Sequence, residues 1–207
     1  MTRLTLSQDR IKEIGSYSAA TIHEAMGKQG ALPSGIKPIN PATRLYGTAY
    51  TVQSIPGDNL LLHRAIAAAS AGDIIIADVS GFYEAGYWGE IMSVASQARG
   101  IAGLVIDGCV RDAIEIEALG FPVFCRGLCI RGTTKHGAGS LNQPISIGDI
   151  HIAPGDVIVG DRDGVVVVPA TRVEETVAKC AARVEKEQRT MQALREGKTT
   201  LEIYGWS

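Results

Sequence analysis

The sequence has few aromatic residues, few cysteines and no excess of charge of one sign. Aromatic residues make up 5% of its 207 residues, and the formal net charge is −2. Because lysine and arginine form no dense run, non-specific electrostatic binding of nucleic acid is not expected. No apolar stretch approaches the roughly 18 residues that a membrane span requires, and the N-terminal segment lacks the apolar core of a secretion signal. We therefore expect neither nucleic acid nor a membrane as a partner.

The scarcity of cysteine excludes several kinds of site. Cys109, Cys125, Cys129 and Cys180 form no C-x-x-C pair, and no histidine lies at zinc-finger spacing from them. Reduced, buried thiols in a cytoplasmic protein are the simplest interpretation. The sequence also contains no G-x-S-x-G motif and no glycine-rich nucleotide motif after a strand, so serine hydrolysis and nucleotide binding have little support.

What is present is the composition of an ordinary globular protein. Hydrophobic residues make up 45% of the chain and charged residues 20%. A chain of this length can bury a substantial core without disulfides or a structural metal. We expect one domain over residues 1–207.

In the first third of the chain, local patterns predict a helix, an extended crossing segment, a strand and a second helix. Their bounds are 8–29, 33–41, 44–54 and 60–70. Ser16 or Ser18 can cap the first helix.

Residues 72–126 then alternate between strand and helix. The strands are 74–77, 103–107 and 123–125, and the helices between them are 90–99 and 111–119. Because these strands are unbroken apolar runs, they are typical of a parallel sheet that is covered on both faces.

The character changes after about residue 127, where an antiparallel β layer is predicted. Four short strands are expected, at 145–147, 150–152, 157–159 and 165–168. Asp163-Gly164 lies between the last two strands and is a strong hairpin signal.

A long helix over residues 171–196 follows these strands. Its apolar positions recur at steps of four and three, and the next slot in that seam is occupied by Glu187. A carboxylate in an apolar seam is costly unless it is paired or reaches water. Exposure of Glu187 beyond the packed part of the helix is the plain interpretation, and a paired, functional carboxylate is the alternative.

Two loops that enter helices directly after strands carry the candidate site. They are Tyr87–Met92 and Asp107–Asp112, and ligands of open α/β sheets bind at such strand ends. Gly89 would let a ligand approach the backbone, and the amides of Gly89, Ile91 and Met92 would be free donors at a helix start. The residues therefore predict a carboxylate site, with an ordinary glycine-containing helix start as the alternative.

Arg111 and Asp112 stand at the second of these helix starts. The guanidinium fork could bind a carboxylate or keto oxygen at two points. A carboxylate is favoured at a helix start in any case, so on residues alone Asp112 is more readily a cap than a metal ligand.

The pattern of Glu90, twenty intervening residues and Arg111-Asp112 resembles a family signature. The family contains the class II 4-hydroxy-4-methyl-2-oxoglutarate / 4-carboxy-4-hydroxy-2-oxoadipate aldolases and the related RraA-like proteins. The resemblance covers nearly the whole chain and ends with Tyr204-Gly205. Further matching segments are Pro56–Leu60, Gly103–Gly108, Phe121–Val123, Gly132–Lys135, Pro154–Asp156 and Asp163–Pro169.

The resemblance implies an α/β/β/α sandwich, with a central, mostly parallel sheet, an antiparallel β layer and a long C-terminal helix. It implies trimers or hexamers whose sites lie between subunits. The residue matching Asp112 would hold Mg²⁺ or Mn²⁺, and Arg111 would contact the oxo acid. Glu24 and Glu187 of a neighbouring subunit would complete the polar shell, and Glu90 stands where many members have aspartate.

The resemblance further implies that the amides of Gly89, Ile91 and Met92 bind the substrate carboxylate. Lys135 is expected to be structural, because the chemistry needs no Schiff base. His63 could approach the pocket, whereas the other histidines are expected on the surface or in structural roles.

The function implied is a metal-dependent lyase of the kind used in aromatic compound degradation. It would cleave 4-hydroxy-4-methyl-2-oxoglutarate or 4-carboxy-4-hydroxy-2-oxoadipate to pyruvate plus pyruvate or oxaloacetate, and also decarboxylate oxaloacetate. Two alternatives stay open: a dedicated oxaloacetate decarboxylase, and an RraA-like regulator that binds and inhibits an endoribonuclease. The joint presence of Asp112, Glu24 and Glu187 favours the enzyme.

Overall fold

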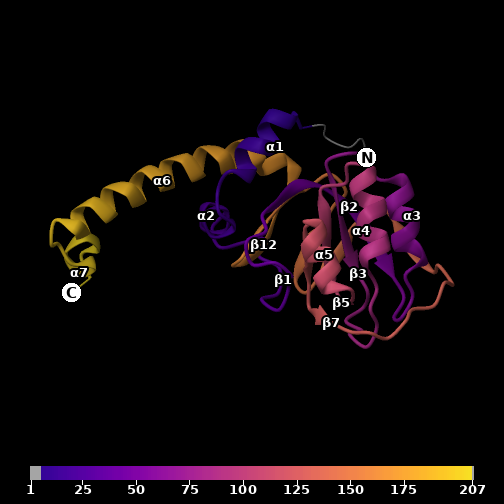
Figure 1. Ribbon diagram of the computed structural model, residues 1–207. Coiled ribbons are helices and arrows are strands. Elements are labelled where there is room, and N and C mark those ends of the chain that lie inside the picture. Colours follow the sequence, from indigo (N-terminus) through magenta and orange to yellow (C-terminus); the bar gives the residue numbers. More distant parts are fainter. Residues whose placement is uncertain (1–5, 207) are drawn as a thin grey trace.

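The framework of the molecule is one strongly curved mixed sheet, to which eight strands of the described residues belong (Figure 1). The computed structural model describes residues 6–206. Across the sheet the order is β1 (Lys37–Pro38), β6 (Val123–Cys125), β4 (Gly103–Asp107), β3 (Asp73–Asp78), β2 (Leu45–Ser54), β11 (Val157–Asp161) and β12 (Gly164–Val168). The eighth strand, β8 (Gly139–Leu141), pairs with the carboxyl end of β2. Because β1 also contacts β12, the sheet is nearly closed.

Strand direction divides this sheet into two halves. β2, β3, β4 and β6 run parallel, whereas β11 pairs antiparallel with both β2 and β12. Asp163-Gly164 lies at the turn between β11 and β12, as the hairpin signal predicted. The predicted parallel and antiparallel parts are confirmed, and the β2–β11 pair joins them into one sheet.

Side chains along the central strands alternate between two hydrophobic cores. In β3, Ile74 and Ile76 belong to the core inside the curved sheet, while Ile75 and Ala77 belong to the core beneath helices. Successive side chains of a strand point to opposite faces, so burial on both faces requires an unbroken apolar run. This is why these strands show no polar alternation in the sequence.

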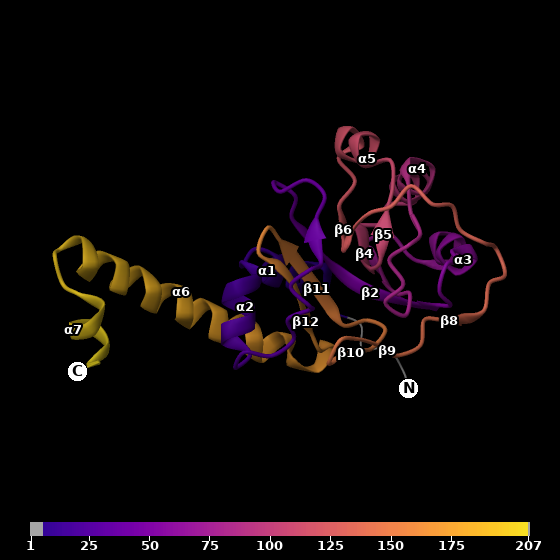
Figure 2. The same ribbon diagram turned by 90° about the horizontal axis from the view of Figure 1, so that it is seen from below.

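Helices cover both outer faces of the curved sheet and give four layers, α/β/β/α (Figure 2). The parallel half packs against α3 (Leu60–Ala68), α4 (Glu90–Ala98) and α5 (Ala113–Leu119). The strands β11 and β12 pack against α1 (Gln8–Gly15), α2 (Ala19–Ala25) and α6 (Val173–Arg195). The inner core also includes the hairpin of β9 (Ile145–Ile147) and β10 (Ile150–Ile152).

The N-terminal segment forms two helices, so the prediction of one helix over residues 8–29 is wrong. α1 ends at Gly15, where a β-carbon would lie 2.4 Å from Cγ of Tyr46, so the close packing against β2 requires glycine. Ser18 then begins α2, because its side chain accepts a hydrogen bond from the amide of Thr21 at 3.0 Å. Ser16 ends α1 instead of beginning a helix.

Helix α5 begins at Ala113, two residues later than predicted. The reason is that Asp112 has a left-handed backbone with a φ of 58°, which an α-helix of L-residues does not accommodate. Arg111 and Asp112 therefore belong to a loop. The remaining short elements are β5 (Cys109–Val110), β7 (Gly127–Leu128), the 3₁₀ turn η1 (Ala170–Arg172) and α7 (Thr200–Tyr204).

Helix α6 extends away from the four layers and leads to α7 (Figures 1 and 2). Its buried residues all lie in the first third of the helix and end at Cys180. Glu187 lies beyond that part, with its side chain 43% exposed and paired with Arg183. Glu187 therefore lies past the packed seam, as the plain interpretation has it, but it is half-exposed and paired, as in the alternative. Although α6 has 23 residues, no helix of residues 6–206 is long and apolar enough to cross a membrane.

Replacement of Ser18 by alanine should destabilise the fold by about 1 kcal/mol, because the amide of Thr21 loses its cap. Denaturant unfolding would measure the loss. Ser34→Ala is the matched control, since Ser34 is exposed and makes no side-chain hydrogen bond to another described residue. Equal stability of the two variants would contradict the assigned cap.

Candidate active site

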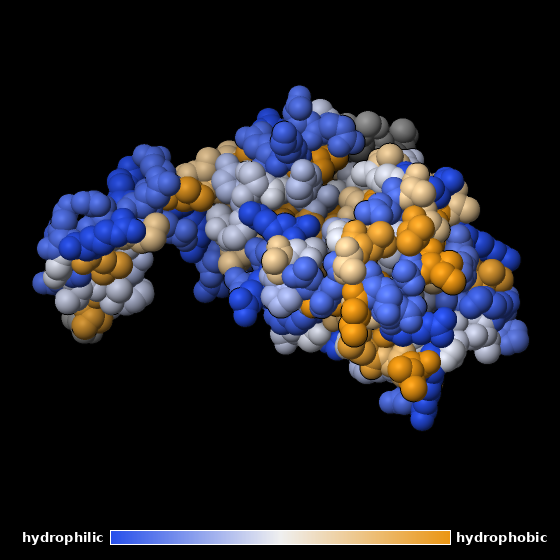
Figure 3. All heavy atoms as spheres, viewed as in Figure 1, coloured by the Kyte–Doolittle hydropathy of each residue, from blue (hydrophilic) through white to orange (hydrophobic). Residues whose placement is uncertain are grey.

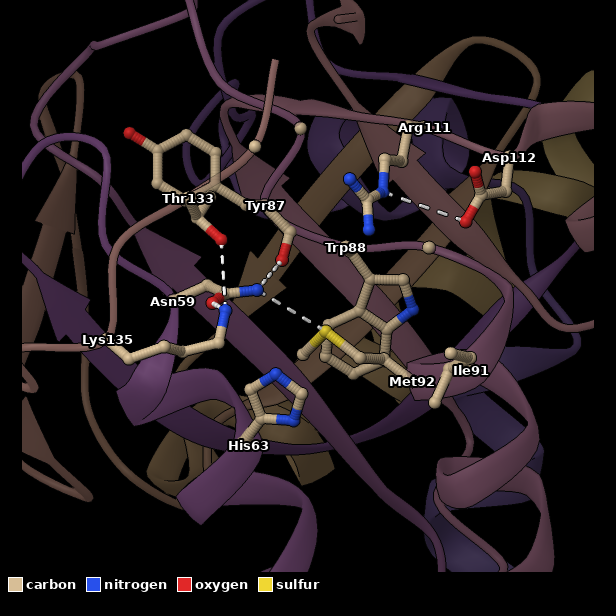
Figure 4. A pocket seen from close by; sticks show the side chains of 13 residues that line it. Asn59, His63, Tyr87, Trp88, Ile91, Met92, Arg111, Asp112, Thr133 and Lys135 are labelled. Carbon is tan, nitrogen blue, oxygen red and sulfur yellow. Dashed lines mark hydrogen bonds and ion pairs between the residues drawn. The ribbon is translucent and has the colours of Figure 1, made fainter. Parts of the chain in front are cut away.

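A pocket of about 240 Å³ opens where three loops meet at the carboxyl ends of the parallel strands (Figure 4). The loops follow β3, β4 and β6 and comprise residues 79–89, 108–112 and 126–136. Five of the predicted site residues line this pocket: Gly89, Ile91, Met92, Arg111 and Asp112. The prediction that the two strand-end loops come together is confirmed.

Gly89 is the N-cap of α4 and lies directly against the carboxylate of Asp112. A β-carbon at position 89 would meet Asp112 Oδ2 at 2.2 Å, and glycine is therefore the only residue that leaves room for this carboxylate. The φ of Gly89 is −155°, an ordinary extended value, so the requirement is steric.

The amides at the start of α4 are arranged as the sequence predicted. The Glu90 amide donates to Asp112 Oδ2 at 3.1 Å. The amides of Gly89, Ile91 and Met92 make no hydrogen bond to another residue within 6–206. First-turn amides and the helix dipole together favour a carboxylate or another small anion at this position.

Asp112 acts as a cap, but for the neighbouring helix and not for its own. It is the N-cap residue of α5 and makes no side-chain cap bond there. Its carboxylate turns instead to α4, through the Glu90 amide, while Arg111 Nε lies 3.8 Å away. The left-handed backbone at Asp112 makes this turn possible. A non-glycine residue in that conformation costs about 1–3 kcal/mol and is often found at functional sites.

Arg111 extends into the pocket from a well-fixed backbone. Its amide donates to the carbonyl of Trp88 at 2.9 Å, and its side chain is 48% exposed. Gly86 gives the necessary space, since a β-carbon there would lie 2.3 Å from the Cys129 carbonyl and 3.2 Å from Arg111 Cβ. The guanidinium is therefore anchored at its base and free at its tip.

Two buried aromatic residues form the floor of the pocket. Trp88 stacks on Phe121 with ring centroids 6.2 Å apart, and its indole N–H donates to Ser93 Oγ at 2.9 Å. The Tyr87 hydroxyl accepts from the Gly57 amide at 2.7 Å. Burial raises the pKa of Tyr87 above its usual value, which keeps the phenol neutral. The floor is rigid and uncharged.

The opposite wall was missed in the sequence. It consists of Asn59, His63, Thr133 and Lys135, from the start of α3 and the loop after β7. Lys135 was expected to be structural, but the structure places it in the pocket wall, where its ammonium donates to Asn59 Oδ1. The Gly132–Lys135 segment was noted only as part of the family resemblance, and His63 was rightly expected near the pocket.

Glu24 and Glu187 lie elsewhere in this chain. Both pair with Arg183, at 3.5 Å and 2.8 Å respectively, on the side of the molecule formed by α2 and α6. Neither lines the pocket. The predicted site residues thus fall into two separate groups within one chain. Glu90 is adjacent to the pocket through its backbone amide at the start of α4. Its side chain is exposed at the first turn of that helix.

The donor atoms around the pocket suit a hard cation that keeps most of its water. Within residues 6–206, no three His, Cys, Asp or Glu side chains cluster as metal ligands, so a closed zinc-type site is not formed. Asp112 offers a carboxylate with Oδ2 already hydrogen-bonded and Oδ1 directed away from Arg111 (Figure 4). One carboxylate completed by water fits Mg²⁺ or Mn²⁺.

The fold and the pocket define the class of the protein. It is a mixed α/β protein with a nearly closed sheet and a small strand-end pocket formed by helix-start amides, one arginine and one carboxylate. Residues 19–167 match the family described as RraA-like, Aldolase/RraA. The chain belongs to this family, which confirms the resemblance seen in the sequence.

Relatives agree with this assignment. A protein of Halalkalibacterium halodurans, provisionally named 4-hydroxy-4-methyl-2-oxoglutarate aldolase, is 36% identical over 95% of this chain and 93% of its own. An uncharacterised protein of Pseudomonas syringae pv. tomato has a crystal structure with a TM-score of 0.86 and 33% identity, covering 96% of this chain and 94% of that one. The family and the first relative support aldolase activity at the level of the family.

A more distant structure shows the fold alone. RraAS2 of Streptomyces coelicolor, an unusual member of the RNase ES inhibitor RraA protein family, superimposes with a TM-score of 0.80 at 24% identity. The superposition covers 91% of this chain and 98% of RraAS2. The architecture is therefore shared by proteins whose sequences have diverged widely.

Gly89→Ala should destabilise the protein by about 1 kcal/mol, because the added methyl group displaces the Asp112 carboxylate from its hydrogen bond with the Glu90 amide. The loss should shrink in an Asp112→Ala background, where the overlapping group is absent. A double-mutant cycle of unfolding free energies measures this coupling. Strict additivity of the two changes would show that the carboxylate does not occupy this position.

Proposed function

We propose that this protein is a divalent-metal-dependent aldolase that releases pyruvate from a 4-hydroxy-2-oxo acid. Its substrates would be 4-hydroxy-4-methyl-2-oxoglutarate and 4-carboxy-4-hydroxy-2-oxoadipate. The observation that carries this proposal is the meeting of free α4 amides, the Arg111 guanidinium and the Asp112 carboxylate in one small pocket. The family match supports the reaction class.

The substrate would be held at its oxo acid end. Its C1 carboxylate would accept hydrogen bonds from the amides of Gly89, Ile91 and Met92, where the helix dipole contributes about 0.3–1 kcal/mol. The guanidinium of Arg111 would donate to the 2-oxo oxygen. The rigid floor of Tyr87 and Trp88 would exclude water from the underside of the pocket.

Asp112 would hold Mg²⁺ or Mn²⁺, which supplies Lewis-acid stabilisation of negative charge on the 2-oxo oxygen. In the cleavage itself, the C4 hydroxyl loses its proton and the C3–C4 bond breaks. The electron pair stays on C3 as an enolate, whose oxygen Arg111 stabilises, and protonation of C3 gives pyruvate. Glu90 and Asp112 would move the protons through ordered water, together with Glu24 and Glu187 of a second subunit.

The same stabilisation would allow decarboxylation of oxaloacetate. There the bond that breaks releases carbon dioxide in place of a carbonyl product, and the enolate that remains is identical. We therefore treat this reaction as a side activity of the same site, with the aldol cleavage as the principal one.

Asp112→Ala should abolish metal-stimulated pyruvate release, and Arg111→Ala should lower kcat by about 10²–10³-fold, because the enolate loses a charged donor. A coupled assay for pyruvate, with chelator and with added Mg²⁺ or Mn²⁺, measures both effects. Asp149→Ala is the control, since Asp149 is an exposed carboxylate remote from the pocket.

The outcomes of this assay separate the alternatives. Chelator-resistant activity in the Asp112→Ala variant would overturn the metal-dependent mechanism. Turnover of oxaloacetate alone would identify a dedicated decarboxylase. Absence of all lyase activity, with binding to an endoribonuclease, would identify a regulator.

We further propose that the working enzyme is a homo-oligomer, a trimer or a hexamer, with sites between subunits. Exposed apolar side chains surround the pocket: Ile91, Ile114, Leu128 and Ile130 are 80%, 79%, 63% and 91% exposed. Figure 3 shows apolar side chains gathered over α4, α5 and β7. A second copy that covers this rim could bring its own Glu24 and Glu187 to the pocket, which a single chain does not do.

Intersubunit complementation tests this arrangement. Asp112→Ala and Glu187→Ala should each be inactive, but co-assembled oligomers should recover about a quarter of wild-type activity, because one interface in four carries both native groups. Co-assembly of Asp112→Ala with Arg111→Ala is the control and should recover nothing, since both residues belong to one pocket wall. Recovery in neither mixture would place Glu187 outside the site.

A further inference from the structure

Two buried charged groups near the pocket take no part in the proposed reaction. Asp107 is the last residue of β4, and Arg126 directly follows β6. Arg126 Nε lies 2.5 Å from Asp107 Oδ1, and the two side chains are 19% and 10% exposed, respectively. A buried ion pair holds its geometry, because moving either group away would leave the other charge without a partner.

The ion pair lies where two segments of the chain leave the main sheet. After Asp107 the chain bends at Gly108 and enters β5, and after Arg126 it enters β7. The strands β5 and β7 pair with each other in a separate two-stranded sheet (Figure 1). The Arg126 amide also donates to the Gly108 carbonyl at 2.9 Å. The ion pair and this hydrogen bond therefore fix both strands at the point where they begin.

The two-stranded sheet carries Arg111 to the pocket. β5 ends directly before Arg111. The Tyr87 amide donates to the Cys109 carbonyl at 3.0 Å, and the Arg111 amide donates to the Trp88 carbonyl at 2.9 Å. The position of Arg111 therefore depends on β5 and on the segment that leads into α4.

Tyr83 ties a third segment to the same ion pair. It belongs to the loop between β3 and α4. Its hydroxyl donates to Asp107 Oδ1 at 3.3 Å, and its ring centroid lies 5.6 Å from Arg126 Cζ, within the range of a cation–π contact. Burial and the charge of Asp107 raise the pKa of Tyr83, so the phenol stays protonated and can donate. All three loops that form the pocket thus meet at Asp107 and Arg126.

We propose that Tyr83, Asp107 and Arg126 act as a positioning cluster for the pocket. The cluster sets where Arg111 lies relative to the amides at the start of α4. This inference rests on the proposed function, because it takes Arg111 to stabilise the enolate. None of the three side chains of the cluster lines the pocket, so they act through Arg111. A displacement of a catalytic group by about 1 Å can cost roughly a hundredfold in rate, and a rigid buried cluster prevents it.

Kinetic coupling to Arg111 tests the cluster. Arg126→Met should lower kcat for pyruvate release by about ten- to a hundredfold, because the guanidinium of Arg111 is no longer held in place. KM should change less than kcat, since the α4 amides still bind the substrate carboxylate. In an Arg111→Ala background, the same substitution should lower kcat by about twofold or less, because the group that it positions is absent.

Conservative variants separate positioning from a loss of folding. Tyr83→Phe keeps the ring and Asp107→Asn keeps the shape, so both should fold and should lower kcat by about two- to tenfold, as for one lost hydrogen bond. Arg126→Lys keeps the charge and should restore part of the activity lost in Arg126→Met. Glu84→Gln is the matched control, because it removes an exposed ion pair with Arg131 that joins two of the same loops. Such a pair contributes little, so kcat should stay at the wild-type value.

Amide hydrogen exchange measures the same coupling without turnover. The Arg111 amide proton is protected by its bond to the Trp88 carbonyl. Its exchange, followed by NMR, should be faster in Arg126→Met by on the order of tenfold, because the strand that precedes it is released. Exchange in Glu84→Gln should equal that of the wild type.

The neighbouring strand offers a second measurement. Asp78 ends β3 and is the register partner of Asp107 in β4. Burial raises the pKa of Asp78 above its usual value, and the charge of Asp107 adds to this effect. The pKa of Asp78, followed by carboxyl-carbon NMR, should therefore fall in Asp107→Asn. An unchanged pKa would show that Asp107 carries no charge at this position and would overturn the ion pair.

The outcomes distinguish the cluster from the proposed function. An equal loss of kcat from Arg126→Met with and without Arg111 would overturn the positioning role, even if the aldolase reaction is demonstrated. Unchanged exchange of the Arg111 amide in Arg126→Met would overturn it as well. Faster exchange in a protein without lyase activity would support the cluster and reject the proposed function.

Discussion

The packing of the Asp112 carboxylate against the backbone at Gly89 and Glu90 is the contact on which the rest of the pocket depends. It closes the amino end of α4 with a group from the next loop, because Oδ2 accepts from the Glu90 amide. It requires the absence of a side chain at position 89, and it is made from a left-handed backbone at position 112. Arg111 directly precedes Asp112 in the same turn. The position of the carboxylate therefore also affects where the Arg111 guanidinium lies.

Several groups in the pocket lack hydrogen-bond partners among the described residues or have a strained backbone, and a bound ligand could compensate for both. Three amides at the start of α4 have no partner among residues 6–206, and the Asp112 backbone is strained. Such features persist only where the surroundings are rigid. Here the rigidity comes from Trp88, which is buried, stacked and hydrogen-bonded, and from Tyr87 beside it. Polar groups that are fixed before the ligand arrives stabilise its charge without reorganisation.

The sequence predicted those features that local patterns determine. Unbroken apolar runs such as Ile74–Ala77 indicated parallel strands, and the meeting of the strand-end loops followed from the parallel sheet. The sequence predictions were wrong where a contact with a residue far away in the chain determines the local structure. Close packing against Tyr46 requires glycine at the last residue of α1, and the Asp112 carboxylate accepts from the Glu90 amide instead of capping its own helix. Lys135 was missed because its role depends on Asn59, 76 positions away in the chain.

The separation of Glu24 and Glu187 from the pocket constrains how a complete site could form. Both carboxylates share Arg183, so they form one charged group on α2 and α6. Helix α6 extends beyond the four layers, which places this group on a part of the chain that can reach another molecule. In the proposed oligomer, a second copy that covers the exposed apolar rim around the pocket would bring these carboxylates with it. In a closed ring each subunit gives this group and receives one, so every pocket would be completed in the same way.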